Sequence, residues 1–160
     1  MLLLITVGYL IFPQFEFQLG NYGSSNTPQI SRAAVIDQLS SIRPGSSLIH
    51  ETYDMLTARG ISTDVFLPVD ITVGFYANLA RRGYDLIILR VHTGLGNVQA
   101  PIGLFTNELY DQNRYVLEQA NLLVGAAQAD PSSPIVFAVT PKFIRETMQG
   151  KFSNLSLIHI

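Results

Sequence analysis

The feature that most limits the fold of this chain is a short apolar run inside the segment YDLIILRVHTG, residues 84–94. From Leu86 to Val91 every residue is aliphatic except Arg90. A near-continuous run of this length is typical of a strand in a parallel sheet whose two faces are both covered by helices. The run therefore predicts an α/β protein. It ends in a histidine, a threonine and a glycine, at the place where a parallel strand reaches solvent.

From Ser31 onward, strand-like and helix-like segments alternate along the chain. The predicted strands are 33–39, 65–67, 86–91 and 135–139, with a short strand or hairpin at 102–106. The predicted helices are 47–60, 72–83, 115–127 and 141–150, and 115–127 has the most regular helical spacing of apolar residues. In the first of them the apolar side is predicted to hold Leu48, Ile49, Met55 and Leu56. This alternation predicts a doubly wound, mostly parallel sheet with helices on both faces.

Composition narrows the function classes. The 160 residues suffice for one domain with a core, and only 14% of them are charged, against roughly 25% in a typical soluble domain. The net charge is -2 and Lys and Arg form no cluster, which argues against nucleic acid as a partner. Cysteine is absent, which excludes disulfides, thiolate metal sites and a cysteine nucleophile within these residues. No metal-ligand spacing or complete dinucleotide fingerprint occurs, so neither a metal nor a cofactor is predicted.

Both ends differ from the middle of the chain. Residues 1–12, MLLLITVGYLIF, are apolar and uncharged. Three interpretations of this segment remain open: a membrane anchor, a signal remnant and a buried strand. Residues 13–30 resemble a linker. An anchor would place the domain outside the cytoplasm, and without one the protein would be cytoplasmic. The last residues, 155–160 (LSLIHI), resemble a translated transposon end used in sequencing libraries, and the alternative is a natural edge strand. The domain proper is therefore taken as 31–154.

Ligands of doubly wound sheets bind beyond the carboxyl ends of the strands. Here those ends are predicted at Asp37, Pro68, the His92 corner and Thr140. A histidine at a strand end often serves only packing. His92, however, closes what is predicted to be a central strand, and Gly94 would allow a substrate to approach the backbone closely. His92 is therefore the first candidate for a catalytic residue.

Together with AAVIDQL (33–39) and FAVTPKFIRETMQGKF (137–152), the segment 84–94 resembles prokaryotic proteins with a caspase-like fold. They belong to the cysteine peptidase clan of caspases, gingipains, legumains and separases, and the resemblance spans 32–154. In that clan a histidine closes the third strand and the nucleophilic cysteine closes the fourth. The resemblance thus implies a fourth strand beginning just after Asn154, so that the sheet is incomplete at the C-terminus.

The resemblance also implies roles for individual residues. His92 would assist proton transfer to the leaving amine, and a backbone N–H at Thr93 or Gly94 would help to stabilise the oxyanion. The clan usually has glycine directly after the histidine, so the choice between Thr93 and Gly94 stays open. Asp37 would belong to the substrate pocket and suit a basic side chain. Arg90, also assigned to substrate binding, is expected to pair with Asp37 or with Glu108.

The resulting hypothesis is a fragment of a caspase-like cysteine endopeptidase, inactive as given because the nucleophile is missing. Its partner would be a peptide or protein substrate, with an N-terminal membrane tether if residues 1–12 are an anchor. Two alternatives remain. One is a non-catalytic module of the same fold that acts in sensing or interaction. The other is a flavodoxin-like domain that binds a small molecule at the His92 corner.

Overall fold

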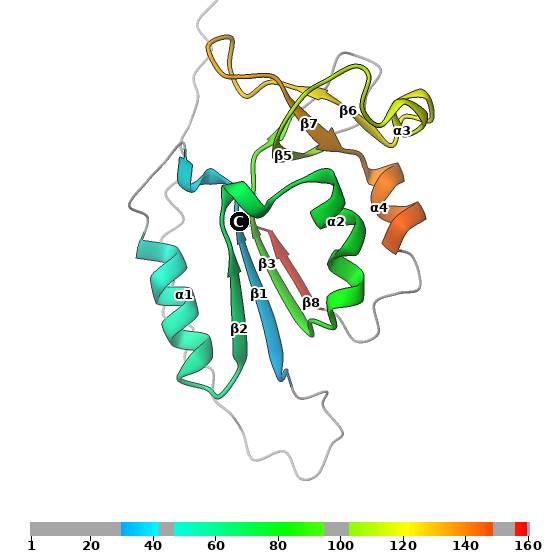
Figure 1. Cartoon of the computed structure of the whole chain (residues 1–160). Coiled ribbons are helices and arrows are strands. Elements are labelled where there is room, and N and C mark those ends of the chain that lie inside the picture. The colour runs from blue at the N-terminus through cyan, green and yellow to red at the C-terminus, as the bar shows by residue number, and fades with distance from the viewer. Residues whose placement is uncertain (1–29, 42–46, 95–102, 149–155, 160) are drawn as a thin grey trace, which may run out of the picture.

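The computed structural model describes residues 30–41, 47–94, 103–148 and 156–159 and contains two sheets (Figure 1). The parallel sheet has the order β2-β1-β3-β8, with β1 (Arg32–Asp37), β2 (Ser62–Phe66), β3 (Leu86–Arg90) and β8 (Ser156–His159). The antiparallel sheet has the order β4-β5-β7-β6, with β4 (Thr93–Gly94), β5 (Gly103–Leu109), β6 (Val124–Ala127) and β7 (Val136–Val139). The helices are α1 (Ser47–Thr57), α2 (Val73–Leu79), α3 (Val116–Ala120) and α4 (Pro141–Met148).

Helices cover both faces of the parallel sheet, α1 on one face and α2 with α4 on the other (Figure 1). Successive side chains of a strand point to opposite faces. Accordingly, Val35 and Ile88 pack with Leu56 of α1, whereas Ile36 and Ile87 belong to the larger core formed with α2 and α4. The prediction of an α/β protein with helices on both faces of a parallel sheet is confirmed. A doubly wound, mostly parallel sheet is not confirmed, because four of the eight strands described form an antiparallel sheet.

Capping residues set the bounds of α2 as the sequence predicts. The Oγ1 of Thr72 accepts a hydrogen bond from the N–H of Phe75 at 3.0 Å, which satisfies one of the free donors of the first turn. After a short 3-10 turn, Gly83 ends the segment with a φ of 70°, a conformation that glycine adopts without strain. The chain then enters β3.

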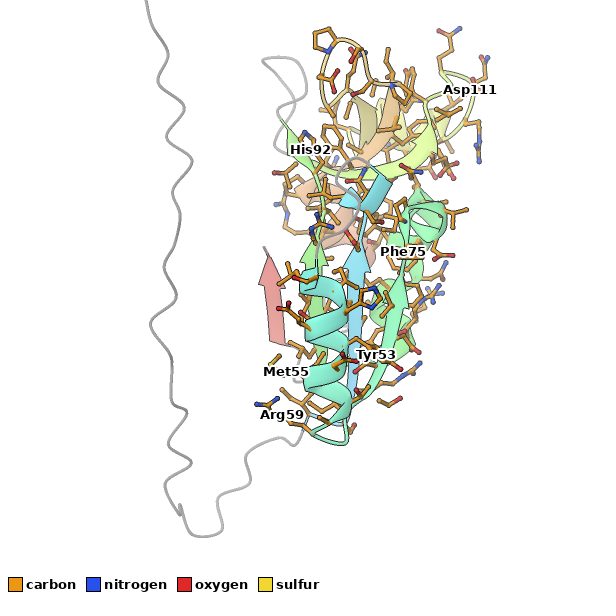
Figure 2. The ribbon with its side chains drawn as sticks, turned by 90° about the vertical axis from the view of Figure 1, so that its left-hand side faces the viewer. Tyr53, Met55, Arg59, Phe75, His92 and Asp111 are labelled. Atoms are coloured by element: carbon orange, nitrogen blue, oxygen red, sulfur yellow. The ribbon has the colours of Figure 1, made fainter. Side chains whose placement is uncertain are left out.

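Helix α1 differs in detail from its predicted apolar side. Thr52 and Leu56 are its buried residues. Met55, predicted to lie with Leu56, is 47% exposed, and Figure 2 shows it on the outer part of the helix with Tyr53 and Arg59. The prediction for Met55 is wrong because position 52 lies one helical turn before 56 and occupies the sheet-facing side instead.

The antiparallel sheet was not predicted. Strand 135–139 was expected in a parallel sheet, but β7 pairs antiparallel with both β5 and β6. Thr140, expected at the carboxyl edge of the parallel sheet, therefore lies elsewhere, where its N–H donates to the carbonyl of Leu123. One face of this sheet, including Phe137 and Val139, packs against the core that contains α2 and α4.

The predicted helix 115–127 is wrong beyond its first turns. Helix α3 ends at Ala120, Leu122 has a φ of 57°, and Val124–Ala127 forms the strand β6. Within α3, Val116 and Leu117 are 58% and 74% exposed. The apolar spacing was real, but pairing with β7 decides the conformation of Val124–Ala127, since tertiary contacts override a local propensity.

The two ends of the chain stand apart from this description. Residues 1–29, with the predicted anchor and most of the linker, lie outside the described residues. Within the described ranges, none of the helices combines the length and the apolar character needed to cross a bilayer. In the C-terminal segment, Ser156–His159 pairs in parallel with β3, in register from Leu86↔Ser156 to Leu89↔His159.

Candidate functional site

His92 lies where the two sheets join. It follows the end of β3 and immediately precedes β4, at the carboxyl end of a strand that is flanked by β1 and β8 (Figure 2). Its side chain is partly exposed, whereas β3 itself is fully buried. The structure thus places His92 at the rim of the parallel sheet, where ligands of α/β proteins bind.

Backbone hydrogen bonds fix the main chain of His92 on both sides. Its N–H donates to Oε1 of Gln38 at 2.9 Å, and its carbonyl accepts from the N–H of Phe105 at 3.0 Å. The N–H of Gln38 donates in turn to the carbonyl of Arg90 at 2.9 Å. The residue after β1 therefore holds the segment that leads from β3 to His92.

The imidazole itself packs against an aromatic ring. The ring centroids of His92 and Phe105 are 4.9 Å apart, with an interplanar angle of 73°. Among the residues that the structure describes, neither ring nitrogen of His92 has a hydrogen-bond or ion-pair partner. Within this part of the chain, the contact with Phe105 is thus what orients the imidazole.

His92 faces away from the core that contains α2 and α4. Phe105, its cross-strand neighbour, belongs to a small cluster with Val136 and Ala138 on the outer face of the antiparallel sheet. The opposite face, which includes Leu104 and Val139, packs on the main core. The imidazole is therefore not enclosed by these helices.

Thr93 and Gly94 form β4, opposite Leu104 and Gly103 of β5. In an antiparallel ladder, pairs that exchange hydrogen bonds alternate with pairs that do not. Because Phe105 donates to the carbonyl of His92, the next pair, Thr93 with Leu104, is of the non-bonded kind. The ladder therefore turns the N–H of Thr93 away from β5 and that of Gly94 toward Gly103.

Gly94 has a packing role that the sequence did not reveal. A Cβ at this position would lie 2.8 Å from Cζ and 3.0 Å from Cε1 of Phe105. These distances are below ordinary van der Waals contact, so only glycine fits without displacing the ring. Gly94 was expected to let a substrate approach the backbone, but the space beside its Cα is occupied by the ring of Phe105.

Arg90 pairs with Asp37, which resolves the choice between Asp37 and Glu108. Nη1 of Arg90 lies 2.7 Å from Oδ1 of Asp37, and the two side chains are only 10% and 3% exposed. The same carboxylate oxygen also accepts from the N–H of Leu39 at 3.2 Å. The two residues are register partners on β1 and β3. Asp37 thus lies at the carboxyl rim as predicted, but its charge is already balanced by Arg90.

Glu108 has a different role, as an anchor between β5 and its neighbours. Its carboxylate accepts hydrogen bonds from the N–H of Val73, at 3.1 Å, and from the hydroxyl of Tyr115, and it pairs with Arg114. Burial, followed by the hydrogen bond to Glu108, raises the pKa of Tyr115. Its phenol therefore remains a donor over a wide pH range.

Tyr76 supports the strand that faces His92. Its hydroxyl donates to the carbonyl of Phe105 at 3.4 Å. Burial raises the pKa of Tyr76 well above the ordinary value of a phenol, so it stays protonated and keeps this bond. Gln38, Phe105 and Tyr76 were not identified from the sequence. Only Gln38 left a usable signal, as a polar residue directly after a buried strand.

The described residues contain no group of three or more His, Cys, Asp or Glu side chains that could hold a metal ion. What the site combines is a partly exposed imidazole at a sheet rim, a backbone N–H turned out of its ladder, and a neighbouring parallel strand. This combination suits proton transfer to or from a bound group. In comparisons with known proteins, no family model, no curated protein and no solved structure matches this chain.

Proposed function

We propose that this chain is part of a caspase-like cysteine endopeptidase in which His92 is the proton-transfer residue. The nucleophile would be a cysteine encoded after Asn154 in the complete protein. The observation that carries the proposal is the position of His92 at the carboxyl end of β3, a strand with parallel neighbours on both sides. An imidazole held there can act on a group that the adjacent strand delivers.

The register of the sheet supports a short distance between the two groups. Leu89, which lies three positions before His92, is paired with His159 of β8. Neighbouring strands are about 4.8 Å apart. A strand in the position of β8 that continued by about three residues would therefore bring its terminal side chain beside the imidazole. In the complete protein we assign that position to the strand that ends in the cysteine.

The proposed chemistry consists of two proton transfers through His92 and an acyl intermediate on the cysteine. The imidazole of His92 takes the thiol proton, and the resulting thiolate attacks the carbonyl carbon of the scissile peptide. When the C–N bond of the tetrahedral intermediate breaks, the imidazolium gives its proton to the leaving amine. Water then attacks the acyl thioester, which releases the new carboxyl group and restores the thiol. One ring nitrogen of His92 serves both proton transfers, first as acceptor and then as donor.

For the oxyanion, the ladder geometry favours Thr93 over Gly94. The N–H of Thr93 is turned out of the β4–β5 ladder, whereas the N–H of Gly94 faces Gly103. A preorganised backbone donor near the carbonyl oxygen is what stabilises a tetrahedral intermediate. Gly94 then contributes through the close packing of Phe105, which orients His92.

The pocket assigned to Asp37 follows from the same resemblance. Asp37 ends β1 beside β3, so it lies on the strand next to the proposed dyad. A basic side chain of the substrate would compete with Arg90 for its carboxylate. We propose that Asp37 and Arg90 together form the wall of the substrate pocket, with selectivity set by how far that pair opens.

The first test is to read the gene past the codon for Asn154 in a library prepared without transposition. An apolar strand ending in cysteine is expected, and a strand without cysteine would contradict the proposal. The completed protein should then cleave a pool of fluorogenic peptides and lose activity on alkylation. His92→Ala should lower kcat/KM by about 10²–10⁴-fold. His50→Ala, at an exposed position of α1, is the matched control and should leave activity unchanged.

A further inference from the structure

A hollow of about 330 Å³ lies on the outer side of the antiparallel sheet, next to the contact between His92 and Phe105. Its apolar walls are Phe105, Ala129, Pro134 and Val136. Gln38 and Asn107 also line it and add carboxamide groups. Binding pockets for small molecules range from about 300 to 1,000 Å³, so this hollow lies at the lower end of that range and has room for a single large side chain.

The hollow shares two walls with the site of His92. The ring of Phe105 contacts the imidazole, with centroids 4.9 Å apart, and also lines the hollow. Gln38 accepts the hydrogen bond from the N–H of His92 and lines the hollow as well. A molecule that occupies the hollow therefore lies directly beside the proposed dyad.

The polar groups of the hollow fit a peptide. Within the described part of the chain, the side-chain amides of Asn107 and of Gln38 donate no hydrogen bond. Carboxamides can donate to and accept from the main chain of a bound peptide. An apolar floor with amides beside it matches an extended peptide that inserts one side chain and bonds through its backbone.

We propose that this hollow is a subsite for a bulky apolar side chain of the peptide substrate. The inference rests on the proposed peptidase function and extends it from the reaction to its selectivity. An extended peptide advances by about 3.3–3.6 Å per residue. Because the ring of Phe105 lies between the imidazole and the rest of the hollow's lining, we assign the inserted side chain to a position two or three residues from the scissile bond.

The test measures kcat/KM of the completed protein on a peptide series. The positions two and three residues on each side of the scissile bond are varied among Phe, Leu, Gly and Asp. Phe or Leu at one of these positions should be preferred over Gly by about tenfold or more. Ala129→Leu, which fills the hollow, should remove this preference and leave cleavage of the Gly peptide within about twofold, in keeping with differential binding.

Ala126→Leu is the matched control, since Ala126 is exposed in β6 and does not line the hollow. It should keep the preference. Val136→Ala, which enlarges the hollow, should shift the preference toward the larger Phe. If the unmodified protein cleaves peptides without a preference for apolar side chains, the proposed subsite is overturned but the proposed peptidase function is not. This result does not depend on whether any variant folds. No cleavage of any peptide would overturn both.

Discussion

The buried ion pair between Asp37 and Arg90 allows a prediction that distinguishes a role of these residues in stability from a role in substrate binding. The two charges are 2.7 Å apart on adjacent strands, with side-chain exposures of 3% for Asp37 and 10% for Arg90. Replacing one partner leaves the other charge buried without compensation. We expect Arg90→Met or Asp37→Asn alone to lower the free energy of unfolding by about 3–5 kcal/mol.

The double variant should behave differently from either single variant. In Asp37→Asn/Arg90→Met both charges are gone, the methionine fills much of the space of the arginine stem, and the asparagine can still accept from the N–H of Leu39. We therefore expect the double variant to lie within about 1 kcal/mol of the original, since a buried pair can often be replaced by neutral groups at little loss. The coupling energy of the cycle should thus be at least about 5 kcal/mol.

The assay is urea unfolding followed by far-UV circular dichroism. The pair of Arg32 and Asp64 serves as a control, because these side chains are 45% and 43% exposed and 2.9 Å apart. Exposed pairs contribute about 0–1 kcal/mol, so Arg32→Met should change the unfolding free energy far less than Arg90→Met. If both substitutions had equally small effects, the assignment of a buried, uncompensated charge would be refuted. In that case Asp37 could pair with a basic side chain of the substrate instead of Arg90 without a loss of stability.

Three further outcomes are expected. Gly94→Ala should lower the free energy of unfolding by about 1–3 kcal/mol, because the added methyl group displaces the ring of Phe105. The NMR signals of the His92 ring should shift as well, and an unchanged spectrum would contradict the contact between Phe105 and His92. Hydrogen bonds from Ser31 and Arg32 lower the pKa of Asp85. The contribution of Asp85 to stability is therefore present above about pH 4, the pKa of an unfolded aspartate, and is lost as the pH falls through the lower pKa of the folded state. Asp85→Asn should flatten the dependence of stability on pH below about pH 4 in an acid unfolding experiment, and an unaltered curve would speak against this role. Residues 31–154 expressed alone should aggregate, because the edge of β3 that pairs with β8 is left open, whereas a monodisperse, cooperatively melting product would disprove this.

Much of the parallel sheet could be predicted from the sequence because its signals are local. The run that became β3 is aliphatic except for Arg90 at its end, and Thr72 and Gly83 bracket α2 with a cap and a left-handed turn. Each of these signals depends only on neighbouring residues. For the same reason the position of His92 at the end of a buried strand followed directly from the sequence.

The antiparallel sheet escaped prediction because its strands are defined by their partners. β6 has the sequence VGAA, in which Val124 is the one β-branched residue and no aromatic residue occurs, so the usual mark of a strand is weak. β5 shifts its register between Phe105 and Leu109, so its burial pattern does not alternate strictly. Pairing between residues as distant as Val124 and Val139 cannot be read from local patterns.

The antiparallel sheet also supplies what the sequence could not assign to the candidate site. The residue opposite His92 is Phe105 of β5, and Tyr76 donates a hydrogen bond to the carbonyl of the same phenylalanine. The orientation of the imidazole thus depends on a strand that the parallel sheet does not contain. Under the proposed function, His92 has to be held in position while one ring nitrogen exchanges a proton. Backbone hydrogen bonds and the ring contact with Phe105 can hold it, and neither of them uses a ring nitrogen.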